Sequence, residues 1–203
     1  MFNIIGATNK FYVEIGFNAD DWTMGSNTYN LNMNHGWKGV MFDGLHENEK
    51  INLYKKFISP ETLVQTFQEH NVPVEVDYVS IDIDSQDLWV LQALIGPQSP
   101  YRPRVISVEY NAHFPLAATV TMPPRLNAAL DEGGGSSGHG DSHRGRMYEP
   151  GVELDHYSWD GFDLYYGASA GALRVVANNG GYEVVQLVGF LDMILVRRDL
   201  LKV

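Results

Sequence analysis

Residues 76–83 constrain the fold of this chain more than any other segment. They read Val-Asp-Tyr-Val-Ser-Ile-Asp-Ile, an apolar stretch with few polar side chains and many that favour β-structure. A strand that is apolar on both faces belongs inside a parallel sheet, where helices cover both sides. The segment therefore predicts a layered α/β fold with this strand near the middle of the sheet.

Further strands and helices alternate on both sides of this segment. One helix start is well marked, because Ser59 suits the N-cap and Pro60 the first helical position. Alternation of this kind predicts a three-layer α/β domain with a mostly parallel sheet. We expect strands at residues 11–15, 38–42, 57–58, 104–110, 182–188 and 193–196. We expect helices at residues 26–34, 47–56, 60–67, 88–95 and 168–177.

The length and composition suit one domain. The chain has 203 residues, 44% of them hydrophobic, which is enough to bury the core of a single α/β domain over residues 1–203. Residues 131–147 depart from the alternating pattern, because they are rich in Gly and Ser and poor in apolar side chains. A segment of this composition cannot bury enough apolar surface to pack, so we expect a flexible insert there.

The charge and the cysteine content exclude several classes of function. The net charge is −11, whereas nucleic acids and anionic membranes need a basic surface, so we expect neither as a partner. There is no cysteine, which excludes disulfides, thiolate metal sites and a cysteine nucleophile. No apolar run approaches the roughly 20 residues of a membrane-spanning helix. The first residues do not read as a secretory signal, so we expect a cytoplasmic protein.

Polar side chains follow four of the expected strands. In an open α/β sheet, ligands bind beyond the carboxyl ends of the strands, near the point where the strand order reverses. These side chains are therefore the candidate site residues. In chain order they are Glu14, Gly16 and Asn18, then Asp43, then Asp82 and Asp84, and finally Glu109, Asn111 and His113.

The first three sets favour a small-molecule site. Glu14, Gly16 and Asn18 form an acidic turn that suits a cationic amino-acid ligand, and the glycine would let such a ligand approach the backbone closely. The carboxylate of Asp43 can accept both hydroxyl groups of a ribose. Asp82 ends a buried strand, where a carboxylate is costly unless it meets a ligand, a cation or a donor. Each has a structural alternative: a strand-end glycine, a turn aspartate, or the cap of the next helix.

The later strand ends also suggest metal and acid–base chemistry. Carboxylate and amide oxygens are hard ligands that suit Mg²⁺ or Ca²⁺. A metal site is therefore one hypothesis for Asp82, Asp84, Glu109 and Asn111. His113 is a candidate general base, because histidine exchanges protons near neutral pH. The alternative is that these polar groups are simply hydrogen-bonded to the protein itself.

Several short motifs follow one another along residues 11–196. They are Tyr12-Val-Glu-Ile-Gly16, Ser26-Asn27-Thr28, Gly36-Trp37-Lys-Gly39 with Asp43, Ser80-Ile-Asp-Ile-Asp84, Pro103-Arg104-Val-Ile-Ser-Val-Glu109-Tyr-Asn111, and Tyr166-Gly-Ala-Ser169. Their order and spacing resemble FkbM-type S-adenosylmethionine-dependent methyltransferases. The resemblance implies a Rossmann-like class I methyltransferase fold, whose seven strands have the order 3-2-1-4-5-7-6.

The resemblance also implies roles for individual residues, with S-adenosylmethionine as the cofactor. By position, Glu14 and Gly16 would border its methionine part, with Asn18 in the same turn. Asp43 would hold the ribose hydroxyls. Asp82 would lie near the reactive methyl group and take part in catalysis.

The function expected on this basis is O-methylation of a small-molecule or glycan-like hydroxyl. His113 is the first candidate for the base and His156 the second, and Mg²⁺ is a candidate second cofactor. One alternative is a catalytically degenerate, methyltransferase-like binding module. Asp20 or Asp21 stands near a place where the family usually has glycine, and Ser85 stands at another. The altered first loop and the short N-terminus favour this alternative, whereas the retained acidic strand ends count against it. A dinucleotide-dependent oxidoreductase is disfavoured, because no GxGxxG motif is present.

Overall fold

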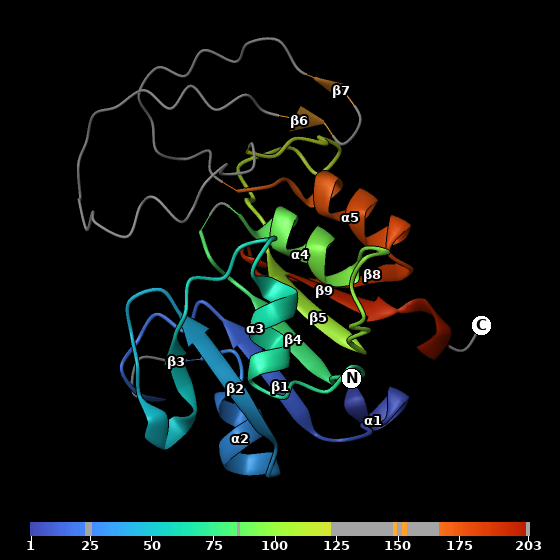
Figure 1. The fold of residues 1–203 in the computed structure, drawn as a ribbon. Coiled ribbons are helices and arrows are strands. Elements are labelled where there is room, and N and C mark those ends of the chain that lie inside the picture. Colours follow the sequence, from blue (N-terminus) through green and yellow to red (C-terminus); the bar gives the residue numbers. More distant parts are fainter. Residues whose placement is uncertain (23–25, 85, 123–147, 150–151, 154–166, 202–203) are drawn as a thin grey trace.

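A seven-stranded sheet forms the centre of the molecule (Figure 1). The computed structural model describes residues 1–22, 26–84, 86–122, 148–149, 152–153 and 167–201. The sheet order is β3-β2-β1-β4-β5-β9-β8, which becomes 3-2-1-4-5-7-6 when its strands are counted along the chain and confirms the predicted order. Its strands are β1 (Phe11–Ile15), β2 (Lys38–Asp43), β3 (Leu53–Lys55), β4 (Tyr78–Ile81), β5 (Val105–Glu109), β8 (Tyr182–Val188) and β9 (Asp192–Arg197).

The sheet is mixed, which corrects the expectation of a mostly parallel sheet. Strands β3, β2, β1, β4 and β5 pair in parallel, but β9 pairs antiparallel with both β5 and β8. The reason is local, since only residues 189–191 connect β8 to β9. A connection this short makes a hairpin and forces its two strands to run in opposite directions. Two further strands, β6 (Tyr148–Glu149) and β7 (Val152–Glu153), form a separate antiparallel pair.

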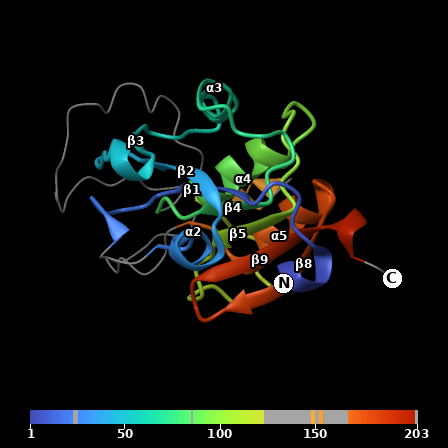
Figure 2. The same ribbon diagram turned by 90° about the horizontal axis from the view of Figure 1, so that it is seen from below.

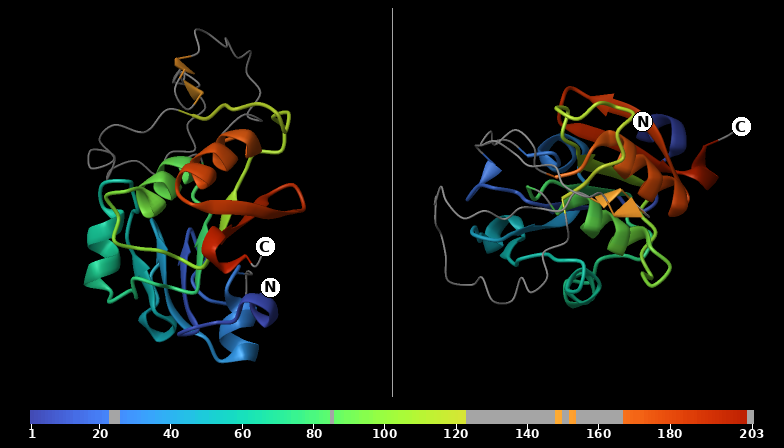
Figure 3. Two further views of the ribbon diagram at one scale, coloured as in Figure 1. Left: turned by 90° about the vertical axis from the view of Figure 1, so that its right-hand side faces the viewer. Right: turned by 90° about the horizontal axis from the view of Figure 1, so that it is seen from above.

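Helices cover both faces of the large sheet, which gives the three layers that were expected (Figure 2). One face carries α3, α4 and α5, and α4 lies beside α5 (Figure 3). The other face carries α2 and, near the strand starts, α1. The helices are α1 (Phe2–Ile5), α2 (Tyr29–His35), α3 (Leu63–Glu69), α4 (Asp87–Ile95) and α5 (Ala170–Asn179), with 3₁₀ turns η2 (Glu49–Ile51) and η4 (Arg198–Leu200).

The core is divided between the two faces of the sheet. The larger cluster joins the strands to the first helix layer through side chains such as Phe67, Leu91 and Leu173, all of which are fully buried. The smaller cluster lies on the α2 face and includes Tyr12 and Trp37. Strand β4 lies at the centre of the sheet order, as its apolar sequence predicted, although it is shorter than residues 76–83.

The region around residue 50 differs from the prediction. Residues 47–56 were expected to be a helix and 57–58 the third strand, but the chain instead forms η2 followed by β3. Asn52 ends the helical turn with a φ of 58°, in the left-handed region that asparagine tolerates. Its carbonyl then accepts a hydrogen bond from Met41 N at 2.9 Å, which aligns Leu53 with β2.

Three expectations from the sequence concern residues outside the described part of the chain. The Gly/Ser-rich segment 131–147 and the second candidate base, His156, both lie there, as does Ser85. Among the helices that are described, none is long and apolar enough to cross a membrane.

Candidate functional site

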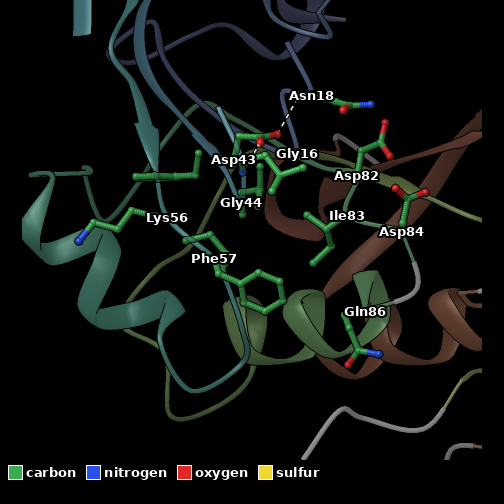
Figure 4. Close-up of a pocket in the computed structure, with 14 residues that line it drawn as sticks. Gly16, Asn18, Asp43, Gly44, Lys56, Phe57, Asp82, Ile83, Asp84 and Gln86 are labelled. Atoms are coloured by element: carbon green, nitrogen blue, oxygen red, sulfur yellow. Dashed lines mark hydrogen bonds between the residues drawn. The ribbon is translucent and has the colours of Figure 1, made fainter. Parts of the chain in front are cut away.

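A cavity of about 290 Å³ opens at the carboxyl ends of β1, β2 and β4 (Figure 4). This volume is at the lower end of the range for small-molecule sites, which is roughly 300–1,000 Å³. Its polar lining includes Asn18, Asp43, Asp82 and Asp84, and its apolar lining includes Phe57. The sequence analysis had selected all four of these polar residues as site candidates.

The sheet topology explains the position of the cavity. Strand β1 pairs with β2 on one side and with β4 on the other. The chain runs outwards from β1 through β2 to β3 and then returns across the sheet to β4, so the strand order reverses beside β1. Connections leave the sheet in opposite directions at such a point, which opens a crevice at the carboxyl ends of the strands.

Gly16 shapes the floor of this crevice. Its φ is +88°, and a Cβ atom built on it would lie 1.6 Å from the carbonyl oxygen of Asp82. The sequence analysis expected this glycine to let a ligand approach the backbone. In the structure, the space of its missing side chain is instead filled by the β4 backbone, and Ile15 O accepts a hydrogen bond from Asp82 N at 3.0 Å.

Asp43 joins the loops that follow β1 and β2. It is 8% exposed, and its Oδ2 accepts a hydrogen bond from Asn18 N at 2.7 Å. Its Oδ1 accepts hydrogen bonds from Leu45 N at 2.7 Å and from His46 N at 2.9 Å. A carboxylate has about four acceptor positions, and the described residues occupy three of them, which leaves one with no donor among these residues to accept from a ligand hydroxyl. Asp43 is therefore a turn aspartate that also faces the cavity.

Asn18 contributes to the site mainly through its backbone. Its φ is 53°, a left-handed conformation that asparagine adopts more readily than most residues. This conformation aims its N–H at the carboxylate of Asp43. The side chain of Asn18 is exposed at the mouth of the cavity.

Asp82 stands among other carboxyl groups at the end of β4. Burial is the main cause that raises its pKa to about 6, and the charges of Asp192 and Asp84 act in the same direction. A hydrogen bond with Glu109 acts in the opposite direction. Asp84 is exposed and has a φ of 51°.

Glu14 has a structural role that the sequence analysis did not foresee. It is 3% exposed, and its carboxylate accepts hydrogen bonds from Ser26 Oγ at 2.6 Å, from Asn27 N at 2.9 Å and from both N and Oγ1 of Thr28. Burial raises its pKa. Glu14 lies outside the described cavity lining and instead fixes the segment that leads into α2.

The residues after β5 form a separate group. Glu109 and Asn111 are buried and His113 is exposed, and none of the three is part of the cavity lining. Asn111 Oδ1 accepts a hydrogen bond from His113 N at 2.8 Å and lies 3.0 Å from its Nδ1. The structure thus holds the imidazole at the carboxyl edge of the sheet without bringing it into the cavity.

The metal hypothesis gains no support from this geometry. Among the residues that the structure describes, no three His, Asp or Glu side chains are grouped so that they could hold a metal ion. Magnesium binding remains a prediction, and no reaction step is assigned to it.

The sequence analysis missed the apolar wall of the cavity and the basic residue Lys56, which is the only Lys or Arg among the described lining residues. Phe57 and Ile83 line the site, and Phe57 is 56% exposed there (Figure 4). The sequence analysis assigned Phe57 to a strand. The signal that could have identified it as a site residue is an aromatic side chain in a loop after a strand. Lys56 and Gln86 complete the missed set.

Comparisons with known proteins do not identify a family for this chain. No family model, no curated protein and no solved structure matches it.

Proposed function

We propose that this chain is an S-adenosylmethionine-dependent methyltransferase of the FkbM type, with a Rossmann-like class I fold. One observation carries the proposal: an acidic cavity at the ends of β1, β2 and β4, in a sheet of order 3-2-1-4-5-7-6. The fold places the cavity where open α/β sheets bind ligands. Its residues offer both carboxylate acceptors and an apolar wall, which suit a cationic nucleoside.

The lining residues divide naturally between the parts of such a ligand. The remaining acceptor position of Asp43 would take a ribose hydroxyl. The ring of Phe57 and the side chain of Ile83 would contact the flat purine, whose faces are apolar. The carboxylates of Asp82 and Asp84 would attract positive charge on the ligand.

The proposed reaction is methyl transfer to a hydroxyl group of a small molecule or glycan. S-adenosylmethionine supplies a methyl group on a positively charged sulfur, and the acceptor oxygen takes it by in-line displacement. The main task of the protein is to hold the two partners in line and keep water away. The hydroxyl must also lose its proton, and His113 is the first candidate to receive it, because it stands at the same edge of the sheet.

Calorimetric titration with S-adenosylmethionine tests this proposal. We expect saturable binding, and we expect Asp43→Asn to weaken it by about 10-fold, because one charged hydrogen bond to the ribose is lost. Asn retains one oxygen acceptor for Leu45 N and His46 N but loses the acceptor for Asn18 N, so circular dichroism and thermal unfolding of the variant are recorded alongside binding. Glu47→Gln, which removes one charge from an exposed side chain outside the cavity, is the control. Absence of binding in the wild type would refute the proposal.

A binding module without catalysis is the second candidate. One observation favours it. The carboxylates of Glu14 and Asp43 accept most of their hydrogen bonds from the protein itself. Incubation with donor carrying a labelled methyl group, across a panel of hydroxyl acceptors, separates the two. Donor binding with no label transferred to any acceptor would support the binding module.

A further inference from the structure

We propose that the cavity selects its ligand by charge, and so binds the sulfonium donor more tightly than the neutral thioether that remains after transfer. This inference rests on the proposed function, because it concerns the same cavity. It adds a physical basis for product release that the fold alone does not supply.

The charges of the described lining residues are unbalanced. Three carboxylates, those of Asp43, Asp82 and Asp84, face one basic side chain, Lys56. Figure 4 shows that the Lys56 side chain extends away from the other lining residues. Its Nζ lies 3.5 Å from an Oε2 atom of Glu69 on α3, so this acidic partner offsets its charge.

The carboxylates at the two ends of the cavity differ in their surroundings. Asp43 receives three backbone N–H groups, whose dipoles offset its charge. At the other end, the charges that act on Asp82 come from Asp84, Asp192 and Glu14, and all are negative. The β4 end of the cavity is therefore the place where a positive ligand group gains most.

The expected size of this preference is moderate. A positive group about 5 Å from a partly exposed carboxylate gains about 1 kcal/mol, which corresponds to about 5-fold in affinity. Two neighbouring carboxylates raise this to about 10-fold. A neutral thioether of otherwise identical structure lacks the attraction, so its contacts with the rest of the cavity alone determine its affinity.

Three ligands that differ only at the sulfur position test the inference by calorimetry at pH 8. They are S-adenosylmethionine, S-adenosylhomocysteine, and the analogue in which a carbon bearing an amine replaces the sulfonium group. We expect both cations to bind about 5- to 10-fold more tightly than the thioether. In Asp84→Asn and in Asp82→Asn this ratio should fall by about half, and in the double variant it should fall toward one, whereas Glu47→Gln should preserve it.

The variants are chosen so that folding does not confuse the result. Asparagine tolerates the left-handed backbone of Asp84, whose φ is 51°. Asp84 is exposed, so its replacement should leave the circular dichroism spectrum unchanged. Equal affinity of the wild type for all three ligands would overturn the inference while leaving the proposed function intact. A preference that persists undiminished in the double variant would also overturn it. Absence of binding by all three would refute the proposed function itself.

Discussion

Asp77 shows how much a single buried carboxylate can organise. It is fully buried, and it accepts hydrogen bonds from the backbone N–H groups of Thr8, Asn9 and Lys10. Its Oδ1 lies 3.1 Å from Nε of Arg104, which is 7% exposed. Arg104 in turn donates to the carbonyl of Ile5 at 2.7 Å. This ion pair ties the N-terminal segment to the starts of β4 and β5.

We expect Asp77→Ala to lower the free energy of unfolding by about 3–5 kcal/mol, because it leaves the Arg104 charge buried without its partner. Urea denaturation measures this change. The control is Glu183→Gln, which breaks an exposed ion pair with Arg198 and should cost less than about 1 kcal/mol. Equal losses of stability in the two variants would contradict the expectation that the buried ion pair of Asp77 contributes more than an exposed one.

Asp87 should make stability depend on pH. It is 1% exposed and accepts a hydrogen bond from Ile83 N at 2.9 Å. Burial is the main cause that raises its pKa to about 7, from 3.8 in the ordinary side chain. Because the folded state favours the protonated form, the contribution of Asp87 to stability is complete below the ordinary pKa. It is lost as the pH rises through about 7.

The variant Asp87→Asn removes this titration and keeps an acceptor for Ile83. Relative to the wild type, its free energy of unfolding should rise by about 2–3 kcal/mol between pH 5 and pH 8. Thermal or urea unfolding at several pH values gives the difference, in which the other titrating groups cancel. A difference that stays constant from pH 5 to pH 8 would contradict the raised pKa.

At the scale of the elements, the close approach of β1 and β4 depends on Gly16. A Cβ atom there would meet Asp82 O at 1.6 Å, and the φ of +88° disfavours any other residue. We expect Gly16→Ala to destabilise the fold by about 3 kcal/mol or more and to abolish ligand binding, because the strands must separate. Gly36 also has a positive φ, of +67°, but has open space around it.

Gly36→Ala is therefore the matched control, and it should cost only the backbone strain, about 1–2 kcal/mol. Denaturation and calorimetry on both variants separate strain from steric overlap. If Gly16→Ala were no worse than Gly36→Ala, the strand ends would have to be less tightly packed than the structure shows.

The whole molecule should respond to the proposed donor by becoming more stable. A ligand at 100 times its Kd raises the free energy of unfolding by about 2.7 kcal/mol, which is about 5–10 °C in Tm for a chain of this size. Differential scanning calorimetry with S-adenosylmethionine measures this. NADH is the control and should leave Tm unchanged. A rise with NADH alone would favour a dinucleotide site instead.

The sequence predicted the strands better than the site. Apolar segments at 11–15 and 38–42 are confirmed as strands, because hydrophobic patterns report burial and both strands are largely buried. Residues 182–188 are also confirmed as a strand, although the second half of that strand is exposed. The third strand was missed, because Leu53–Lys55 has little pattern of its own and becomes a strand only through pairing with β2. The polar residues at the strand ends could be found because the strands before them were recognised from their apolar sequences. Phe57 lies in a loop, where no hydrophobic pattern marks its position.

By itself, the sequence determined the α/β class, the central position of β4 and the row of acidic side chains at the strand ends. These features follow from the residue types in short segments, which are the same whatever conformation the chain adopts. Only the tertiary structure decided that Glu14 serves the loop before α2, that Asp43 faces the cavity, and that His113 stands apart from it. Those outcomes depend on which segments meet after folding. The residues that a side chain contacts depend on distances in the folded molecule. The spacing of residues along the sequence does not specify those distances.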